Sequence, residues 1–199
     1  MGLAEKIQWI SIDEYLAGEE ISQIKHEYLD GVGYAMVETS DRHNRIAGNI
    51  FNALHIHLAD NPCEPFMESM KVRVDPKTCY YLDVLVACEG AEANPYYRNE
   101  PRVIVEVTSP STERIDRIEK LSAYKQISSL QEYLIVSQET VRIDLYRRLP
   151  DQSWQCELFT QPSEELHLES VNLTLSVAHI YRRGTFPPPQ PRSQVVDEE

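Results

Sequence analysis

The sequences YYLDVLV at residues 80–86 and PRVIVEVT at residues 101–108 decide the fold predicted for this chain. Each stretch is short, rich in β-branched residues and bounded by residues that favour turns, a pattern typical of a buried central strand. Each also contains one acid, Asp83 in the first stretch and Glu106 in the second. A buried carboxylate costs free energy unless a cation or hydrogen bonds compensate its charge. Two such strands side by side, with their acids at matching heights, would form a cation site.

The pattern around these two stretches predicts an α/β fold. A helix at about 112–127, carrying Lys120, follows the second stretch, and the pair Asp30-Gly31 between alternating apolar residues predicts a hairpin. A helix is predicted at 11–18, where Ser11 and Glu14 can form a capping box, and another at about 42–59, where Ser40 caps a helix whose Ile46, Ile50 and Leu54 recur every four residues. A short helix is predicted at 176–183. Further strands are predicted near 65–74, at 132–136, at 141–147 as a half-exposed edge strand, and around 154–158. This order predicts one mixed central sheet flanked by helices, with an N-terminal β-hairpin extension and extra C-terminal strands.

The composition is that of a globular protein with one domain. The chain has 199 residues, of which 42% are hydrophobic and 26% charged. We expect a single domain over residues 1–186 and a disordered, Pro-rich acidic tail at 187–199. The sequence has no apolar run long enough to span a membrane and no secretion signal, so we expect a cytoplasmic protein. The four cysteines show no close pairing or zinc-type spacing and are expected to be reduced.

The net charge of −13 argues against a nucleic-acid partner without excluding one. The charge is uneven along the chain. Residues 1–38 contain eight acids and two lysines, whereas residues 98–125 contain six bases and five acids. Because the local field, more than the total charge, steers a polyanion, residues 98–125 remain compatible with binding DNA.

The two acids and the lysine indicate phosphodiester chemistry. Carboxylate oxygens on adjacent strands suit Mg²⁺ or Mn²⁺, which keep several waters and accept phosphate oxygens. Such a metal can activate a water molecule and stabilise charge on a phosphoryl group, and a nearby lysine can hold that water or the phosphate. Asp83, Glu106 and Lys120 are therefore predicted to form a site that hydrolyses a phosphodiester bond.

Five stretches carry a family resemblance: KHEYLDG at 25–31, RHN at 42–44, YLDV at 81–84, VEVTSPST at 105–112, and DR with EK at 116–120. Through them the chain resembles the PD-(D/E)XK nuclease superfamily. Within that superfamily it looks like the Uma-two family of restriction-endonuclease-like proteins, formerly catalogued as a domain of unknown function. The resemblance covers about residues 9–182. It implies a Mg²⁺- or Mn²⁺-dependent endonuclease that cleaves DNA by a metal-activated water.

The resemblance assigns Asp83 to the aspartate of the family's Pro-Asp pair and Glu106 to the acid of the next strand. The chain departs from the superfamily pattern twice. Leu82 stands where the proline precedes the aspartate, and Thr108 stands where the superfamily has its lysine, two residues after the acid. In this family the lysine function is placed on the following helix, and Lys120 fits that role.

The resemblance also implies three further site residues. Glu27 would be a third metal carboxylate beside Asp83 and Glu106, His43 would contact substrate or water, and Tyr124 would lie one turn after Lys120 on the same helix face. The competing interpretations are structural: Glu27 as an exposed hairpin acid, His43 in a local hydrogen bond, and Lys120 in a solvated pair with Asp116.

Two other functions remain open at this stage. One is a non-catalytic binding or regulatory protein on a nuclease scaffold, because a fold does not imply a function. The other is a hydrolase of small phosphodiesters or nucleotides, which would suit the acidic charge. A homodimer is expected, since two-fold dimers are the commonest oligomers and the strand at 141–147 and Trp154 lie outside the nuclease core.

Overall fold

The computed structural model describes residues 9–36, 39–88, 93–110 and 112–184. In these residues the strands form a six-stranded, a five-stranded and a two-stranded sheet. The six-stranded sheet has the order β11-β10-β9-β8-β6-β3, and it is mixed because β8 and β9 are parallel whereas its other neighbours are antiparallel. Its strands are β3 (Glu64–Met67), β6 (Val84–Ala87), β8 (Pro101–Thr108), β9 (Glu132–Ser137), β10 (Ile143–Arg148) and β11 (Trp154–Phe159). The predicted mixed central sheet is therefore confirmed.

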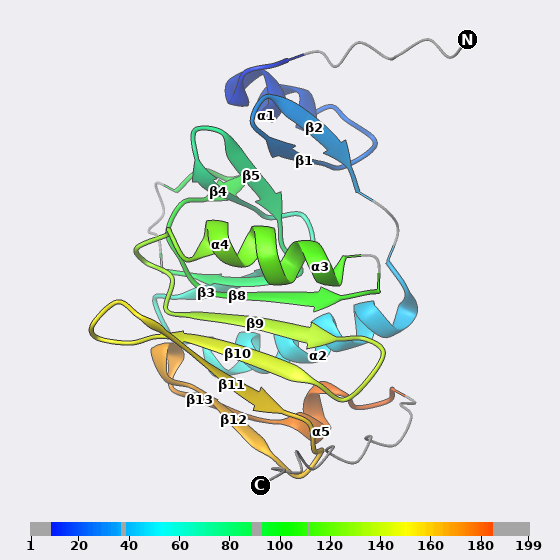
Figure 1. Ribbon diagram of the computed structural model, residues 1–199, viewed down its shortest axis with the longest axis vertical. Helices are drawn as coiled ribbons and strands as arrows, with labels where there is room; N and C mark the ends of the chain where they lie inside the picture. Colours follow the sequence, from blue (N-terminus) through cyan, green and yellow to red (C-terminus); the bar gives the residue numbers. More distant parts are fainter. Residues whose placement is uncertain (1–8, 37–38, 89–92, 111, 185–199) are drawn as a thin grey trace, which may run out of the picture.

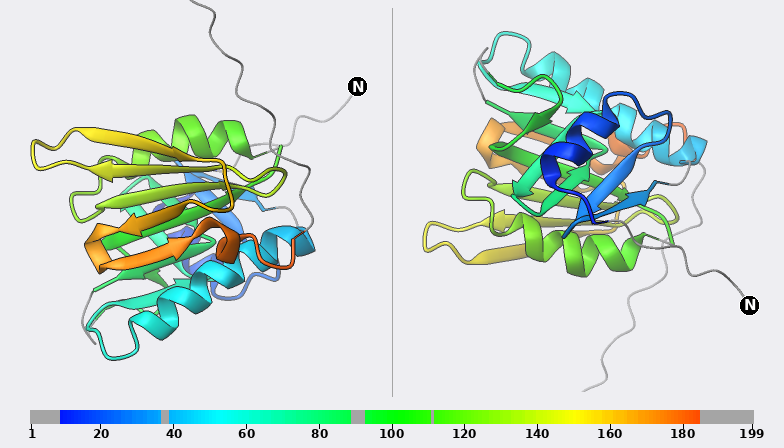
Figure 2. Two further views of the ribbon diagram at one scale, coloured as in Figure 1. Left: turned by 90° about the horizontal axis from the view of Figure 1, so that it is seen from below. Right: turned by 90° about the horizontal axis from the view of Figure 1, so that it is seen from above.

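Helices cover both faces of this sheet (Figures 1 and 2). On one face lie α2 (Asp41–His57) and α5 (Val177–Ile180), together with the hairpin β12 (Glu165–Leu168) and β13 (Leu173–Ser176). On the other face lies one helical stretch in three parts, α3 (Glu113–Ile115), the π-helical turn η1 (Asp116–Lys120) and α4 (Leu121–Tyr124). No helix in the described ranges is both long and apolar enough to cross a membrane.

Alternation along β8 divides the core into two layers. Val103, Val105 and Val107 pack against α2, where Ile46, Ile50 and Leu54 repeat every four residues as the sequence predicts. Ile104 packs on the opposite side, with the tyrosines and leucines around α4. Because successive strand residues face opposite sides, Glu106 points toward α4 like Ile104 does.

The N-terminal hairpin belongs to a second sheet, with the order β2-β1-β5-β4-β7. The hairpin turns at Asp30 and Gly31, whose φ angles are 45° and 91°, as expected for an Asp-Gly turn. The strands of this sheet are β1 (His26–Leu29), β2 (Val32–Ala35), β4 (Lys71–Asp75), β5 (Thr78–Tyr81) and β7 (Tyr97–Arg98). The helix α1 (Ile12–Glu19) begins with the predicted capping box of Ser11 and Glu14, and it extends one residue past Gly18.

The stretch at 80–86 is not the single strand that the sequence predicts. It is divided between β5 and β6, which belong to different sheets, and Leu82 and Asp83 form the link. The predicted strand near 65–74 is divided in the same way into β3 and β4, around Glu68 with a φ of 57°. Both segments of the chain therefore pass from one sheet to the other at the same level. Asp83 lies outside the β6–β8 ladder, where its side chain can reach other elements.

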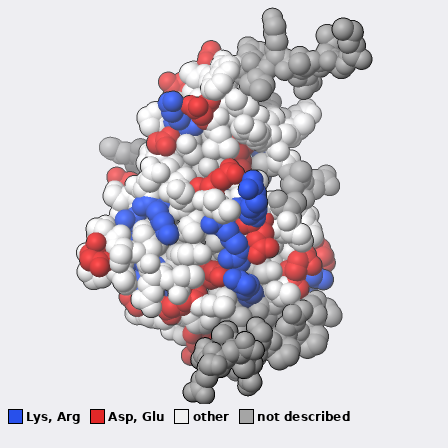
Figure 3. Space-filling model, viewed as in Figure 1, with Lys and Arg blue, Asp and Glu red and all other residues white. Residues whose placement is uncertain are grey.

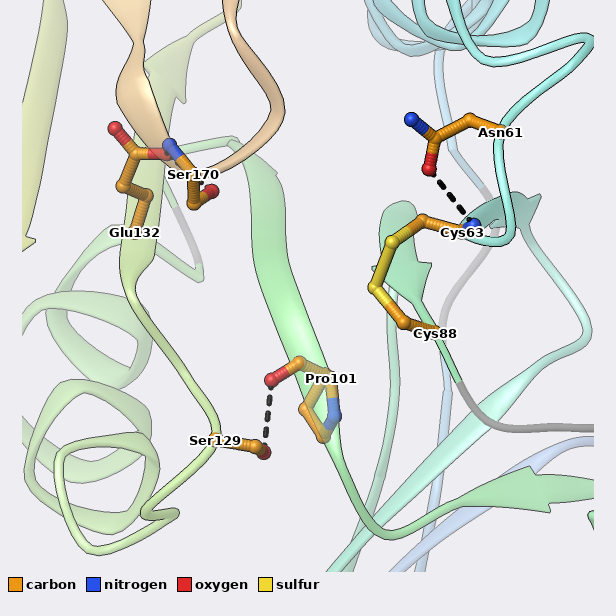
Figure 4. Close-up of a disulfide and its surroundings, with 7 residues drawn as sticks. All are labelled: Asn61, Cys63, Cys88, Pro101, Ser129, Glu132 and Ser170. Carbon is orange, nitrogen blue, oxygen red and sulfur yellow. Dashed lines mark hydrogen bonds between the residues drawn. A yellow bond between two sulfur atoms is a disulfide. The ribbon is translucent and has the colours of Figure 1, made fainter.

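The C-terminal part differs from expectation in two respects. β10 is an interior strand between β9 and β11, so the predicted edge strand is wrong and β11 occupies the edge. The sequence also does not predict β7 or the β12–β13 hairpin, because strands of two to four residues are too short for a clear alternation. The short helix η2 (Glu169–Val171) follows β12, and its Ser170 donates a hydrogen bond to the buried Glu132 of β9 (Figure 4). The predicted tail at 187–199 lies outside the described residues.

A disulfide joins Cys63 and Cys88, so the expectation that all four cysteines are reduced is wrong (Figure 4). In the antiparallel pair β3–β6, Glu64 lies opposite Ala87, which brings Cys63 and Cys88 opposite each other. Sequence spacing of 25 residues could not show this, because the contact depends on how β3 and β6 pair. Disulfides are more typical of oxidising compartments than of the cytoplasm predicted from the sequence.

We expect Cys63→Ser to lower the free energy of unfolding by about 3 kcal/mol, since the disulfide closes a loop of 25 residues. Urea unfolding of the oxidised proteins measures the difference. Cys156→Ser is the matched control, because Cys156 is an exposed free thiol and its loss should change stability by less than about 0.5 kcal/mol. Equal stability of Cys63→Ser and the parent would contradict the expectation.

Candidate active site

Glu106 lies at the centre of the site. It is only 4% exposed on β8, and its Oε1 accepts hydrogen bonds from Lys120 Nζ at 3.1 Å and from the hydroxyl of Tyr124 at 2.9 Å. The two donors reach the same oxygen because residues four apart on a helix share a face. The helical stretch that packs on β8 therefore directs Lys120 and Tyr124 toward Glu106, the one acid of that strand.

The ammonium of Lys120 is enclosed by carboxylates from three elements. Its Nζ lies 2.9 Å from Glu27 Oε1 on β1, 3.1 Å from Glu106 Oε1 on β8 and 3.5 Å from Asp116 Oδ1 in η1. It also lies 5.3 Å from the ring centre of Tyr80. Lys120 is 7% exposed, so it points into the protein and not into solvent.

Asp83 lies beside Glu106 because of strand register. Val84 pairs with Val105 in the antiparallel β6–β8 ladder, and the preceding residue, Asp83, therefore comes level with Glu106. Oδ2 of Asp83 accepts a hydrogen bond from the backbone N–H of Val107 at 2.7 Å and lies 3.1 Å from Nε2 of His43. His43 belongs to the first turn of α2, which begins after the cap residue Ser40.

The structure thus brings the predicted site residues together, although they come from five separate stretches of sequence. Glu27 is half-buried and lies against Lys120, so it is not the exposed hairpin acid of the competing interpretation, and the buried His43 contacts Asp83. From the sequence, Asp116 is expected only as a surface partner of Lys120, and Tyr80 is not expected at the site. Asp116 is buried, and the signal that could have identified it is its i−4 spacing from Lys120.

The residues of the site lie within a stretch that matches a known protein family. The family model Uma2, described as "Putative restriction endonuclease", matches residues 12–178, which include the residues of the site. The chain belongs to the Uma2 family. The resemblance recognised in the sequence is therefore confirmed.

Similar proteins support the same assignment. "Uncharacterized protein slr1290" of Synechocystis sp. is 37% identical to this Uma2 protein over 179 residues, which cover 89% of this chain and 94% of the relative. "Uncharacterized protein sll1609" of the same organism is 30% identical over 145 residues, covering 71% and 82%. A crystal structure from Anabaena variabilis, titled a "putative nuclease belonging to DUF820", superimposes with a TM-score of 0.68 over 86% of this chain and 97% of the other. At 16% identity, that match shows a shared fold.

The electrostatics of this Uma2 site leave an excess of negative charge. Burial raises the pKa of Glu106 well above its usual value, and nearby Asp116, Asp83 and Glu27 raise it further, although Lys120 opposes them. Burial also raises the pKa of Asp116. For Lys120, burial alone would lower the pKa, but the surrounding carboxylates raise it well above the ordinary lysine value. One ammonium cannot neutralise this group of acids, so the site favours either a bound proton or an additional cation.

The donor set fits an additional hard cation. Glu27 Oε1 is buried and, among the described residues, receives no hydrogen bond of good geometry despite its closeness to Lys120. Within the described residues, no group of three or more His, Cys, Asp or Glu side chains is arranged to hold a metal ion. Asp83 and Glu106 instead offer two carboxylates, and Mg²⁺ is commonly held by one or two carboxylates with waters completing its shell.

A separate ion-pair group attaches the helix that carries Lys120 to the sheet. The buried Asp144 of β10 accepts hydrogen bonds from Arg117 Nη2 at 2.8 Å and from both Nε and Nη2 of Arg142 at 3.0 Å. Burial would raise the pKa of Asp144, but these hydrogen bonds outweigh burial and lower it. Because Arg117 lies within η1, this contact fixes the turn that positions Lys120.

Proposed function

We propose that this Uma2 protein is a Mg²⁺-dependent endonuclease that hydrolyses phosphodiester bonds of DNA. The observation that carries the proposal is the buried ammonium of Lys120 beside Glu106, with Asp83 at the same level of the neighbouring strand. Two carboxylates can hold the metal and a lysine can stabilise the phosphate or the attacking water in metal-assisted hydrolysis of a phosphodiester. The family description and the fold support the same conclusion.

Asp83 and Glu106 are the residues that would hold Mg²⁺ or Mn²⁺, and Glu27 is the candidate for a third carboxylate. When bound, the cation lowers the pKa of a water molecule and stabilises negative charge on the phosphoryl group. Asp83 is already oriented for this role by the N–H of Val107, and Glu106 is oriented by the hydroxyl of Tyr124.

Lys120 would supply positive charge to the attacking water or to the phosphate, replacing the lysine absent at Thr108. His43 would hold Asp83 in place and contact water or substrate, because its Nε2 is 3.1 Å from Asp83 Oδ2. Lys120 and His43 lie on helical segments that pack against the sheet, so they are preorganised for charge that develops in the transition state.

The surface near the helix suits a polyanionic partner. On the face that carries α3 and α4, Lys and Arg side chains gather in patches among acidic ones (Figure 3). Arg117 and Arg142 meet at Asp144, and the exposed Arg114 lies one turn before Arg117. Such local positive charge can guide the DNA backbone to a protein whose net charge is −13.

The competing function is a non-catalytic binding protein on the same fold. The observation in its favour is that three carboxylates already surround Lys120, which limits its contact with a substrate. Metal binding and cleavage separate the two functions, since a non-catalytic protein requires neither.

The first prediction concerns the two acids. We expect Asp83→Asn and Glu106→Gln each to abolish Mn²⁺ binding and cleavage while the protein still folds, because each removes one of the two charges on the cation site. Isothermal titration calorimetry measures the binding. Glu119→Gln, an exposed acid of the same helical stretch, is the control and should bind Mn²⁺ as the parent does. Unchanged affinity in both variants would refute the metal site.

The second prediction concerns Lys120. We expect Lys120→Met to slow DNA cleavage by about 10² or more, the effect of losing one preorganised electrostatic contact. Since this change leaves buried carboxylates without their cation, the unfolding free energy should also fall by about 3–5 kcal/mol.

Cleavage rates for this variant are to be compared per folded molecule, with circular dichroism to measure the folded fraction. Lys125→Met removes a lysine of the same helix that contacts Trp154 and Tyr146, and it should keep the parental rate. Lys120→Arg retains the positive charge and tests whether that charge alone is sufficient for cleavage. A folded Lys120→Met that cleaves at the parental rate would exclude the proposed role.

The third prediction concerns assembly. We propose a homodimer, because β11 has no partner strand on its outer edge in the described sheet, and because the same strand exposes Leu158 and Cys156. Uncovered edge strands readily pair with another chain. Light scattering at micromolar concentration should give twice the chain mass, and a mass of 23.0 kDa would refute the dimer.

A further inference from the structure

We infer that Asp116 is a positioning residue for Lys120. It keeps its contact with the ammonium of Lys120 when Glu106 binds a divalent cation. This inference rests on the metal-binding part of the proposed function. It adds a fourth carboxylate to the site and assigns it a role distinct from that of a metal ligand.

The inference starts from the crowded surroundings of Lys120. A lysine ammonium has three N–H groups, and carboxylate oxygens of Glu27, Glu106 and Asp116 all lie within 3.5 Å of it. Glu106 accepts a hydrogen bond from this ammonium, and Glu27 and Asp116 lie close enough to occupy the space around its other N–H groups. A water molecule or a phosphate that approaches Lys120 therefore competes with these carboxylates for the ammonium.

Glu106 is the partner that Lys120 loses most readily in the metal-bound protein. Asp83 and Glu106 would hold a divalent cation, which would compete with Lys120 for the Glu106 carboxylate and would repel the ammonium. Tyr124, which donates a hydrogen bond to Glu106 in this structure, would still hold that side chain. The loss of Glu106 frees one N–H group of Lys120 for the substrate.

Asp116 is the partner best placed to remain. It lies four residues before Lys120 in the same turn, whereas Glu27 and Glu106 belong to strands of two different sheets. Its side chain is buried, and the residue is 3% exposed. A shift of the helix therefore moves Asp116 and Lys120 together and leaves their contact intact.

The π-helical turn fixes Asp116 further. Its backbone carbonyl accepts a hydrogen bond from the N–H of Leu121, five residues later, and another from the hydroxyl of Tyr133 at 3.2 Å. Tyr133 lies on β9, so the sheet itself holds the start of the turn. π-helical turns often occur at functional sites, where they orient a side chain.

A crystal structure of the Mn²⁺-soaked protein tests the inference directly. We expect the ammonium of Lys120 to stay about 3.5 Å or less from Asp116 and to leave hydrogen-bonding distance of Glu106. The inference is overturned if Lys120 keeps Glu106 and leaves Asp116, if Asp116 itself ligates Mn²⁺, or if the site binds no Mn²⁺.

A double-mutant cycle provides the kinetic test. We expect Asp116→Asn to lower kcat about tenfold or more through a misplaced ammonium, with KM changed by less than about threefold. Asp116→Glu should restore part of kcat. In a Lys120→Met background, Asp116→Asn should have no further effect, because Asp116 acts through Lys120.

Glu119→Gln is the matched control for this cycle, and each rate is expressed per folded molecule. A parental kcat in Asp116→Asn, or an equal loss with and without Lys120, would overturn the inference. Failure of the proposed function is distinct: a protein that binds Mn²⁺ and shifts Lys120 toward Asp116 but cleaves no DNA refutes the nuclease and leaves the positioning role intact.

Discussion

The buried ammonium of Lys120 is the interaction on which the site depends. It contacts carboxylates from β1, β8 and η1, which belong to two sheets and a helix. Removing either member of a buried ion pair leaves an uncompensated charge, so these elements depend on one another for their positions. The ammonium that holds these elements together is also the charge that hydrolysis of a phosphodiester would use.

The junction between the two sheets explains why the acids meet there. The chain passes between the sheets at Glu68 and again at Leu82–Asp83, so these linking residues lie outside the strand ladders. A residue in a ladder has its side chain fixed to one face of the sheet. Asp83, just outside the ladder, can instead contact His43 of α2 and the backbone of Val107 at once. The site lies at this irregular point, whereas regular strands form the core around it.

Much of the architecture follows from local patterns. The Ser11 and Ser40 caps, the Asp30-Gly31 turn and the repeat of Ile46, Ile50 and Leu54 all act over a few residues and were predicted correctly. Three features were not predicted: the division of 80–86 between two sheets, the interior place of β10 and the Cys63–Cys88 pair. Each of these depends on which strand lies beside which, and pairing between distant segments leaves no periodicity in the sequence.

The sequence by itself determined that two apolar stretches each carry an acid and that a lysine follows on a helix, since burial of a charge is costly enough to be visible in one stretch. It also determined the Uma2 family and the α/β class. Only the tertiary structure decided that Glu27 and Asp116 share Lys120 with Glu106, and that His43 contacts Asp83. Ion pairs form between groups that are close in space, and the folded chain brings Glu27 to Lys120 across 93 positions of sequence only because β1 pairs with β5 next to the junction.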